Sequence, residues 1–252
     1  MTTNITVLDI ETTGLTATSQ LVCFTLGHQQ VMREPGESEQ FILKFLSEAI
    51  NQCKDNLLVT FAGAPKFGSF KGLDIPFLKN RYIQNDMIDR YPFVGMDHLD
   101  VSDMAVKHLI TATEENPKID DLTADLVIRL MHIVNMVPTK TKKTNVGMLE
   151  EITDPEMLDK IKSFMSVHGE SKLRDHNSLD SICLNVFNNF GQDLTDHIVG
   201  ADVPQIWKQY CKTNDDGCKA QILNHNYMDV KKTYMLFRAL EKLTSYRPIT
   251  TL

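Results

Sequence analysis

A short apolar strand that ends in two acidic residues is the feature that most constrains how this chain folds. Residues 4–10 and 21–28 are rich in β-branched and apolar side chains, and a turn rich in Thr and Gly joins them. This pattern predicts two neighbouring strands that open a sheet. Because side chains alternate along a strand, Asp9 and Glu11 project from the same face. Two carboxylates at the end of a buried strand repel each other unless a cation lies between them, so the pair indicates a shared metal.

Helix and strand patterns then alternate through the first hundred residues. Residues 37–53 place apolar side chains at helical spacing, and residues 57–63 resume strand character. The stretch 63–72 contains Gly and Pro and is predicted as a loop, followed by a helix with Asp74 as its N-cap. A further strand is expected within residues 93–101. This order predicts an α/β fold with a mixed sheet flanked by helices.

The second half of the chain has a helical pattern. Residues 112–174 combine polar and apolar helical segments with a basic link, which we interpret as a helical insertion within a single domain spanning residues 1–252. Helices are expected from residue 178 and from about residue 217 to 243. At 252 residues with 42% hydrophobic side chains, the chain is long enough for one such domain with a full core.

Charge and cysteine content exclude some function classes. The net charge of −7 argues against a protein that coats nucleic acid by bulk electrostatics, although it is compatible with a nuclease whose bound metals supply positive charge. The five cysteines form no CxxC pair, so neither a zinc site nor disulfides are expected. No apolar run approaches the roughly 20 residues that span a bilayer, and no signal-type segment opens the sequence. We therefore expect a cytoplasmic location.

Three short segments contain acidic residues in a characteristic order: DIETTGL from Asp9, GLDIPFL at 72–78 and HNYMD at 225–229. They resemble, in this order, the three motifs of the DEDD exonuclease superfamily, whose members remove nucleotides from 3′ ends. Segments 98–105, 178–187 and 201–207 are also similar to the exonuclease domains of family B DNA polymerases and their free-standing relatives, in the same order. The resemblance covers nearly the whole chain outside the insertion and implies a ribonuclease H-like fold.

The resemblance also implies a site and an activity. Asp9, Glu11 and Asp229 would hold one divalent cation, Mg²⁺ or Mn²⁺, and Asp9 with Asp74 a second, so that both cations stabilise a 3′→5′ hydrolysis of terminal phosphodiester bonds. The partner would be single-stranded DNA or RNA with a free 3′ end. By the same resemblance, the terminal nucleotide would be seated by residues of the turn after the first strand, namely Thr12, Gly14 and Leu15.

Two departures from the family pattern leave alternatives open. Ser69 stands where relatives carry Asn, and His225 precedes Asp229 by four residues where Tyr is usual. Residues four apart share a helix face, so His225 rather than Tyr227 is the favoured proton acceptor, although a surface histidine has the same pattern. Asp9 as a turn cap with a solvated Glu11 is the simpler interpretation of the first motif. An inactive nucleic-acid-binding or complex-forming relative, and an endonuclease on the same scaffold, are the competing functions.

Several further residues are weaker candidates for the site. Asp100 follows a predicted strand and could approach the metals, whereas Asp103 is more simply an N-cap. A basic cluster of Lys140, Lys142 and Lys143 could guide a nucleic-acid strand but also fits a solvated loop. The aromatic residues Phe67 and Trp207 could stack on bases, although a helix-anchoring core position is favoured for the tryptophan.

Overall fold

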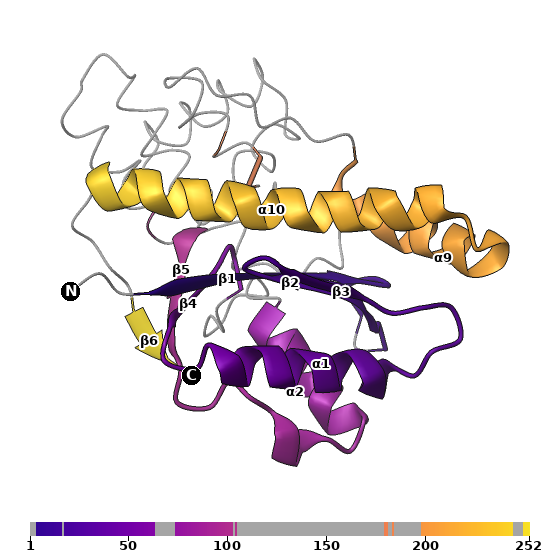
Figure 1. Ribbon diagram of the computed structural model, residues 1–252, viewed down its shortest axis with the longest axis horizontal. Coiled ribbons are helices and arrows are strands. Elements are labelled where there is room, and N and C mark those ends of the chain that lie inside the picture. Colours follow the sequence, from indigo (N-terminus) through magenta and orange to yellow (C-terminus); the bar gives the residue numbers. More distant parts are fainter. Residues whose placement is uncertain are drawn as a thin grey trace, which may run out of the picture.

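The computed structural model describes residues 4–16, 18–63, 74–102, 104, 179–180, 183, 198–243 and 249–252. These residues form a six-stranded sheet with helices on both faces, as Figure 1 shows. The strands are β1 (Ile5–Thr12), β2 (Leu21–Leu26), β3 (Gln29–Met32), β4 (Leu57–Thr60), β5 (Asp97–Asp100) and β6 (Ile249–Thr251). The helices are α1 (Glu39–Gln52), α2 (Asp74–Gln84), η1 (Ile88–Arg90), η3 (Gly200–Asp202), α9 (Val203–Thr213) and α10 (Asp216–Leu243).

The sheet has the order β3-β2-β1-β4-β5-β6 and is mixed. β1, β2 and β3 form an antiparallel meander, β4 and β5 run parallel to β1, and β6 returns antiparallel at the edge. The carboxyl ends of β1, β4 and β5 therefore meet at one edge of the sheet. In open α/β sheets this edge is where ligands bind.

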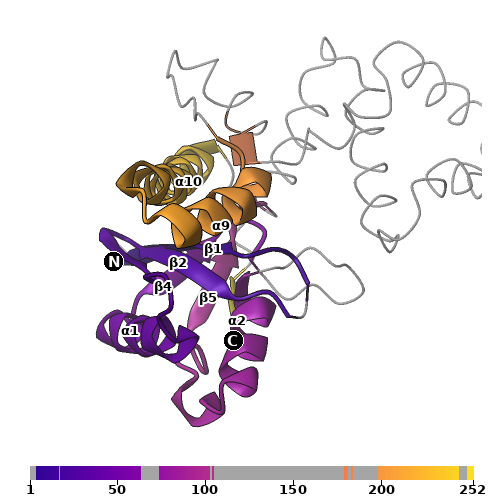
Figure 2. The same cartoon turned by 90° about the vertical axis from the view of Figure 1, so that its right-hand side faces the viewer.

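Two layers of helices cover the two faces of the sheet. α1 and α2 lie on one face, and α9 and the 28-residue α10 lie on the other, as the rotated view makes plain (Figure 2). β1 contributes to both layers because its side chains alternate: Leu8 and Ile10 join the core beneath α1 and α2, and Val7 joins the core beneath α10. Asp9 and Glu11 project from the same face of β1 as Val7, toward α10.

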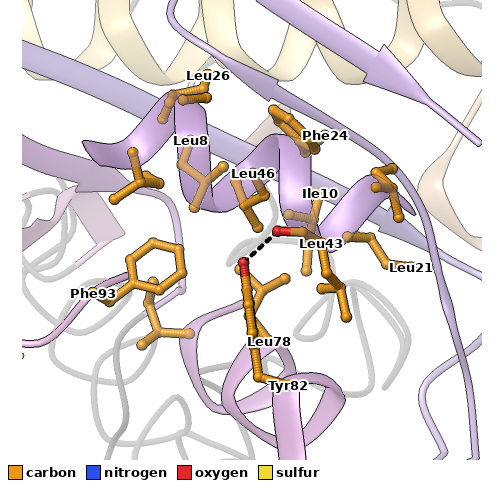
Figure 3. Close-up of a cluster of buried hydrophobic side chains, with 14 of the residues drawn as sticks. Leu8, Ile10, Leu21, Phe24, Leu26, Leu43, Leu46, Leu78, Tyr82 and Phe93 are labelled. Atoms are coloured by element: carbon orange, nitrogen blue, oxygen red, sulfur yellow. Dashed lines mark hydrogen bonds between the residues drawn. The ribbon is translucent and has the colours of Figure 1, made fainter. Parts of the chain in front are cut away.

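The core between the sheet and α1 is closed by hydrogen bonds as well as apolar contacts. Tyr82 of α2 is fully buried, and its hydroxyl donates to the Leu43 carbonyl oxygen at 2.7 Å (Figure 3). The Ser47 hydroxyl lies 2.8 Å from the same Tyr82 oxygen. A buried tyrosine is stable only when its hydroxyl is paired, so these bonds fix α2 against α1.

The expected α/β architecture is confirmed, and several element boundaries differ from the sequence prediction. The predicted strand 57–63 ends at Thr60, because Ala62 adopts a left-handed conformation with φ of 55°. The strand expected within 93–101 spans only Asp97–Asp100, because residues 92–95 form a turn in which Gly95 has φ of 79°. Asp74 is the first residue of α2 rather than its N-cap. β3 and β6 had no predicted counterpart.

The insertion at 112–174 lies outside the described residues, as do Phe67, Ser69, Asp103 and the lysine cluster at 140–143. Trp207 is buried, with its ring centroid 5.8 Å from that of Tyr210 and the Arg33 guanidinium carbon 5.3 Å from its ring centroid. The anchoring role favoured for this tryptophan is therefore confirmed. Within the described part of the chain, no helix combines the length and the apolar character needed to cross a membrane.

Candidate active site

The site begins with Asp9 and Glu11 at the carboxyl end of β1. Glu11 is 7% exposed, and Asp9 is half-buried beneath α10. Oδ2 of Asp9 accepts a hydrogen bond of 2.6 Å from the Asn226 amide nitrogen, and the Thr25 hydroxyl donates to the Asn226 amide oxygen. The fully buried Asn226 thus fixes the Asp9 carboxylate from α10. Sequence reasoning missed Asn226, although its position three residues before Asp229 placed it on the same helix face.

α10 brings His225 to the two carboxylates predicted to lie near it. His225 is 2% exposed, and its Nε2 lies 3.5 Å from Oε1 of Glu11 and 3.9 Å from Oδ2 of Asp229. Tyr227 is 42% exposed and lines a different pocket, beside His28 in the turn between β2 and β3. Of the two candidate proton acceptors, His225 is therefore the one beside the carboxylates.

Asp74 reaches the same edge of the sheet from the start of α2. Its Oδ2 is buried and has no hydrogen-bond partner in the described structure. Burial raises the pKa of Asp74 to about 8, and repulsion from Asp100 and Asp229 adds to the shift. A buried carboxylate oxygen without a hydrogen-bond donor destabilises the folded protein unless it is protonated or bound to a cation.

Asp100, at the end of β5, has a structural task beside this site. Its Oδ1 accepts hydrogen bonds from the Ala62 amide at 2.8 Å, from the Ser102 amide at 3.0 Å and from the Ser102 hydroxyl at 2.6 Å. These bonds cap the segment that follows β5 and hold the chain where β4 ends. The negative charge of Asp100 still acts on Asp74, because it contributes to the raised pKa of that group.

The four predicted carboxylates interact electrostatically although they come from three elements. Burial raises the pKa of Asp9 well above its ordinary value, and repulsion from Glu11, Asp229 and Asp74 raises it further, against the hydrogen bond from Asn226. Burial also raises the pKa of Asp229, against the opposing effect of His225 and Lys232. The negative charge that the site cannot disperse by itself is what a bound cation would neutralise.

The donor set suits a hard divalent cation, since it consists of carboxylate oxygens and includes the unpartnered Oδ2 of Asp74. The side chains are not yet in a coordinating arrangement, because no three His, Cys, Asp or Glu side chains among the described residues are grouped closely enough to hold a metal ion. The carboxylates are held instead by protein partners, Asn226 on Asp9 and Lys232 on Asp229. Binding a cation therefore requires the carboxylates to converge further.

A cavity of about 440 Å³ opens beside Glu11 and Asp74. Thr12, Gly14 and Leu15 line it, so all three predicted nucleotide-seating residues lie next to the carboxylates. The turn is fixed locally: the Thr12 hydroxyl donates to the Gly14 carbonyl oxygen at 2.7 Å, and Gly14 has φ of 149°, which other residues rarely adopt. Leu15 is 78% exposed, which does not fit ordinary packing of a turn. Phe77 of α2, Gly200 and Ala201 of η3, and Pro204 of α9 also line the cavity.

A family model described as the RNase_H superfamily matches residues 167–241. The match covers less than half of the chain and includes His225, Asn226 and Asp229, but not Asp9, Glu11 or Asp74. Neither the curated proteins nor the solved structures contain a match to the chain. The mixed six-stranded sheet and this match together support a ribonuclease H-like α/β fold. Members of this superfamily are typically nucleases.

Proposed function

We propose that this protein is a metal-dependent 3′→5′ exonuclease that hydrolyses terminal phosphodiester bonds of single-stranded DNA or RNA. One observation carries the proposal: carboxylates from β1, α2 and α10 lie close enough, near the carboxyl ends of the parallel strands, to raise one another's pKa. The superfamily match supports a nuclease in general. The assignment to 3′ ends is supported by the three motifs around Asp9, Asp74 and Asp229.

Asp9, Glu11, Asp74 and Asp229 are the residues that would hold divalent cations, Mg²⁺ or Mn²⁺. Such cations supply the positive field that phosphate needs at a site of four carboxylates, and they stabilise charge on attacking and leaving oxygens. The protein supplies the placement. Asn226 holds Asp9 in position, and the His225 imidazole and the Lys232 ammonium flank Asp229.

The cavity gives the substrate a place beside the carboxylates. Leu15 and the aromatic ring of Phe77 both line the cavity and present apolar surface against which a terminal base can pack. The turn at Thr12 and Gly14 brings backbone close to the same space without a side chain at Gly14.

The test is digestion of a 5′-labelled single-stranded oligonucleotide of DNA and one of RNA in the presence of Mn²⁺ or Mg²⁺. Stepwise shortening from the 3′ end with release of mononucleotides is expected, and a circular single strand should remain intact. Cleavage of the circle would indicate an endonuclease. Mn²⁺ binding without turnover of any substrate would indicate the inactive, nucleic-acid-binding alternative.

His225 is expected to accept the proton from the attacking water, because its Nε2 lies next to Glu11 and Asp229. Replacing it with glutamine keeps the volume but removes the base, so kcat should fall about 10²- to 10⁴-fold. Mn²⁺ binding and the melting temperature should change little. His28→Gln, on the exposed turn between β2 and β3, and Tyr227→Phe are the matched controls and should retain full kcat. If Tyr227→Phe and not His225→Gln lost activity, the roles of the two residues would be reversed.

A further inference from the structure

Lys232 is a fully buried lysine placed between two acidic side chains. Its side chain is 0% exposed, and its Nζ lies 2.6 Å from Oδ1 of Asp180 and 3.1 Å from Oδ1 of Asp229. Asp180 belongs to a helical segment described at residues 179, 180 and 183, which packs against α10 in the core shared by Leu179 and Cys183. The ion pairs therefore connect that segment to the candidate active site.

This lysine is charged in the folded protein. Burial disfavours the ammonium, but Asp229 and Asp180 outweigh that effect and raise the pKa of Lys232 above its ordinary value. A buried charge of this kind is tolerated only where it is paired and hydrogen-bonded. Its side chain is closed to solvent, so Lys232 cannot touch a substrate and can act only through its neighbours.

The geometry distinguishes the two oxygens of Asp229. Oδ1 accepts from Lys232, and Oδ2 faces Nε2 of His225 at 3.9 Å. Lys232 and Asp229 are three residues apart on α10 and share a face of the helix, so the contact needs no bend in the backbone. Asp180 also binds the ammonium, at 2.6 Å, and this second contact limits the positions that Nζ can take. The buried Lys232 thus sets the orientation of the Asp229 carboxylate.

We infer that Lys232 is a positioning residue that fixes the Asp229 carboxylate for cation binding, with Asp180 as its anchor. The inference rests on the proposed metal-dependent function. It assigns the segment around Asp180 a task in the site: the segment holds Lys232, and Lys232 directs Oδ2 of Asp229 toward the space shared with Glu11 and His225. Partners behind a ligating carboxylate commonly control metal affinity in this way.

The test is Mn²⁺ binding measured by isothermal titration calorimetry on the whole chain. Lys232→Met keeps the buried aliphatic volume and removes the charge, and it should weaken Mn²⁺ binding about 10- to 100-fold. Lys231→Met, the exposed neighbour on α10, is the matched control and should bind Mn²⁺ as the unaltered protein does. Asp180→Asn leaves the lysine in place but loosens its anchor, and it should cause a smaller loss in the same direction. Asp180 is half-exposed, so this variant keeps the fold even if Lys232→Met does not.

The outcomes separate this inference from the proposed function. If Lys232→Met and Asp180→Asn bind Mn²⁺ as tightly as the unaltered protein, or more tightly, the ion pairs serve packing or merely repel the cation, and the inference is wrong. A fall in melting temperature without a change in Mn²⁺ affinity leads to the same conclusion. Protein that binds Mn²⁺ in a Lys232-dependent way but cleaves no oligonucleotide supports the inference and contradicts the nuclease. Absence of Mn²⁺ binding in the unaltered protein overturns both.

Discussion

Asp9→Asn is expected to abolish nuclease activity while stabilising the metal-free protein at neutral pH. Asp9 interacts with three other carboxylates of the site, so its loss should reduce kcat by at least about 10³-fold, on the scale of losing a preorganised electrostatic contact. Asparagine retains an oxygen that accepts from Asn226, so the fold is preserved. Its neutral amide also removes the need to take up a proton, or to carry a negative charge, beside Glu11, Asp74 and Asp229. Nuclease activity should therefore fall while the free energy of unfolding of the metal-free protein rises.

The pH dependence of stability follows from the same carboxylates. Asp9 and Asp74 have raised pKa values in the folded protein, that of Asp74 about 8, so between about pH 4 and 8 the folded state holds protons that the unfolded state releases. The free energy of unfolding of the metal-free protein should consequently fall as pH rises through this window. In Asp9→Asn the fall should be shallower. Thermal unfolding in a chelator at several pH values measures it.

Addition of a divalent cation should reverse this loss of stability. At a concentration of Mn²⁺ about a hundred times Kd, binding to the folded state stabilises by ~2.7 kcal/mol. For a chain of this size that corresponds to a rise in melting temperature of roughly 5–10 °C. Asp9→Asn should show little or no rise. Asp55→Asn, which alters an exposed acid in the turn after α1, should respond to Mn²⁺ as the unaltered protein does. An equal Mn²⁺ response in Asp9→Asn would place the cation elsewhere.

Much of the fold could be predicted because the decisive patterns are local. The first hairpin, α1 and α10 follow from apolar periodicity, and the confirmed pairing of β1 with β2 follows from a turn rich in Thr and Gly between two strand-like runs. β6 could not be predicted, because a three-residue strand acquires its identity only by pairing with β5. β3 was missed for a related reason: it is short, and half of it is polar. The boundaries of β4 and β5 depend on positive-φ turns that periodicity does not reveal.

The residues of the candidate site could likewise be predicted only in part. Asp9, Glu11, Asp74, His225 and Asp229 could be proposed because motifs carry them, and the structure places them at one edge of the sheet; their roles stay predictions. The partners that hold them could not be proposed, since Asn226 bonds to a residue 217 positions away and Lys232 to one 52 positions away. Only tertiary packing brings such groups together. A buried lysine on an otherwise regular helix face looks in sequence like a solvated one.

Arg81→Met is expected to destabilise the protein more than any surface charge change, because it breaks a buried network that holds α2. Arg81 and Glu39 are 5% and 4% exposed, and the Arg81 Nε lies 2.9 Å from Oε1 of Glu39. Glu39 also accepts from the Leu21 amide at 2.6 Å and from Asn85 at 2.8 Å, so α1, α2 and β2 share one carboxylate. Removing the guanidinium leaves this carboxylate buried without its cation, which typically costs 3–5 kcal/mol, or roughly 10 °C in melting temperature.

Loss of the Arg81 ion pair should also disturb the position of Asp74 in the candidate site, because α2 begins at Asp74 and Arg81 lies two turns further along it. Mn²⁺-dependent stabilisation should therefore weaken in Arg81→Met along with the fold. Arg238→Met is the matched control: its 2.7 Å pair with Glu241 lies on the exposed side of α10, where an ion pair contributes less than about 1 kcal/mol. The double variant Glu39→Gln with Arg81→Met removes the stranded charge and should be more stable than Arg81→Met alone. If the double variant lost the sum of the two single effects, the buried pair would not be the cause, and α2 would owe its position to the apolar contacts of Tyr82 and Leu78 instead.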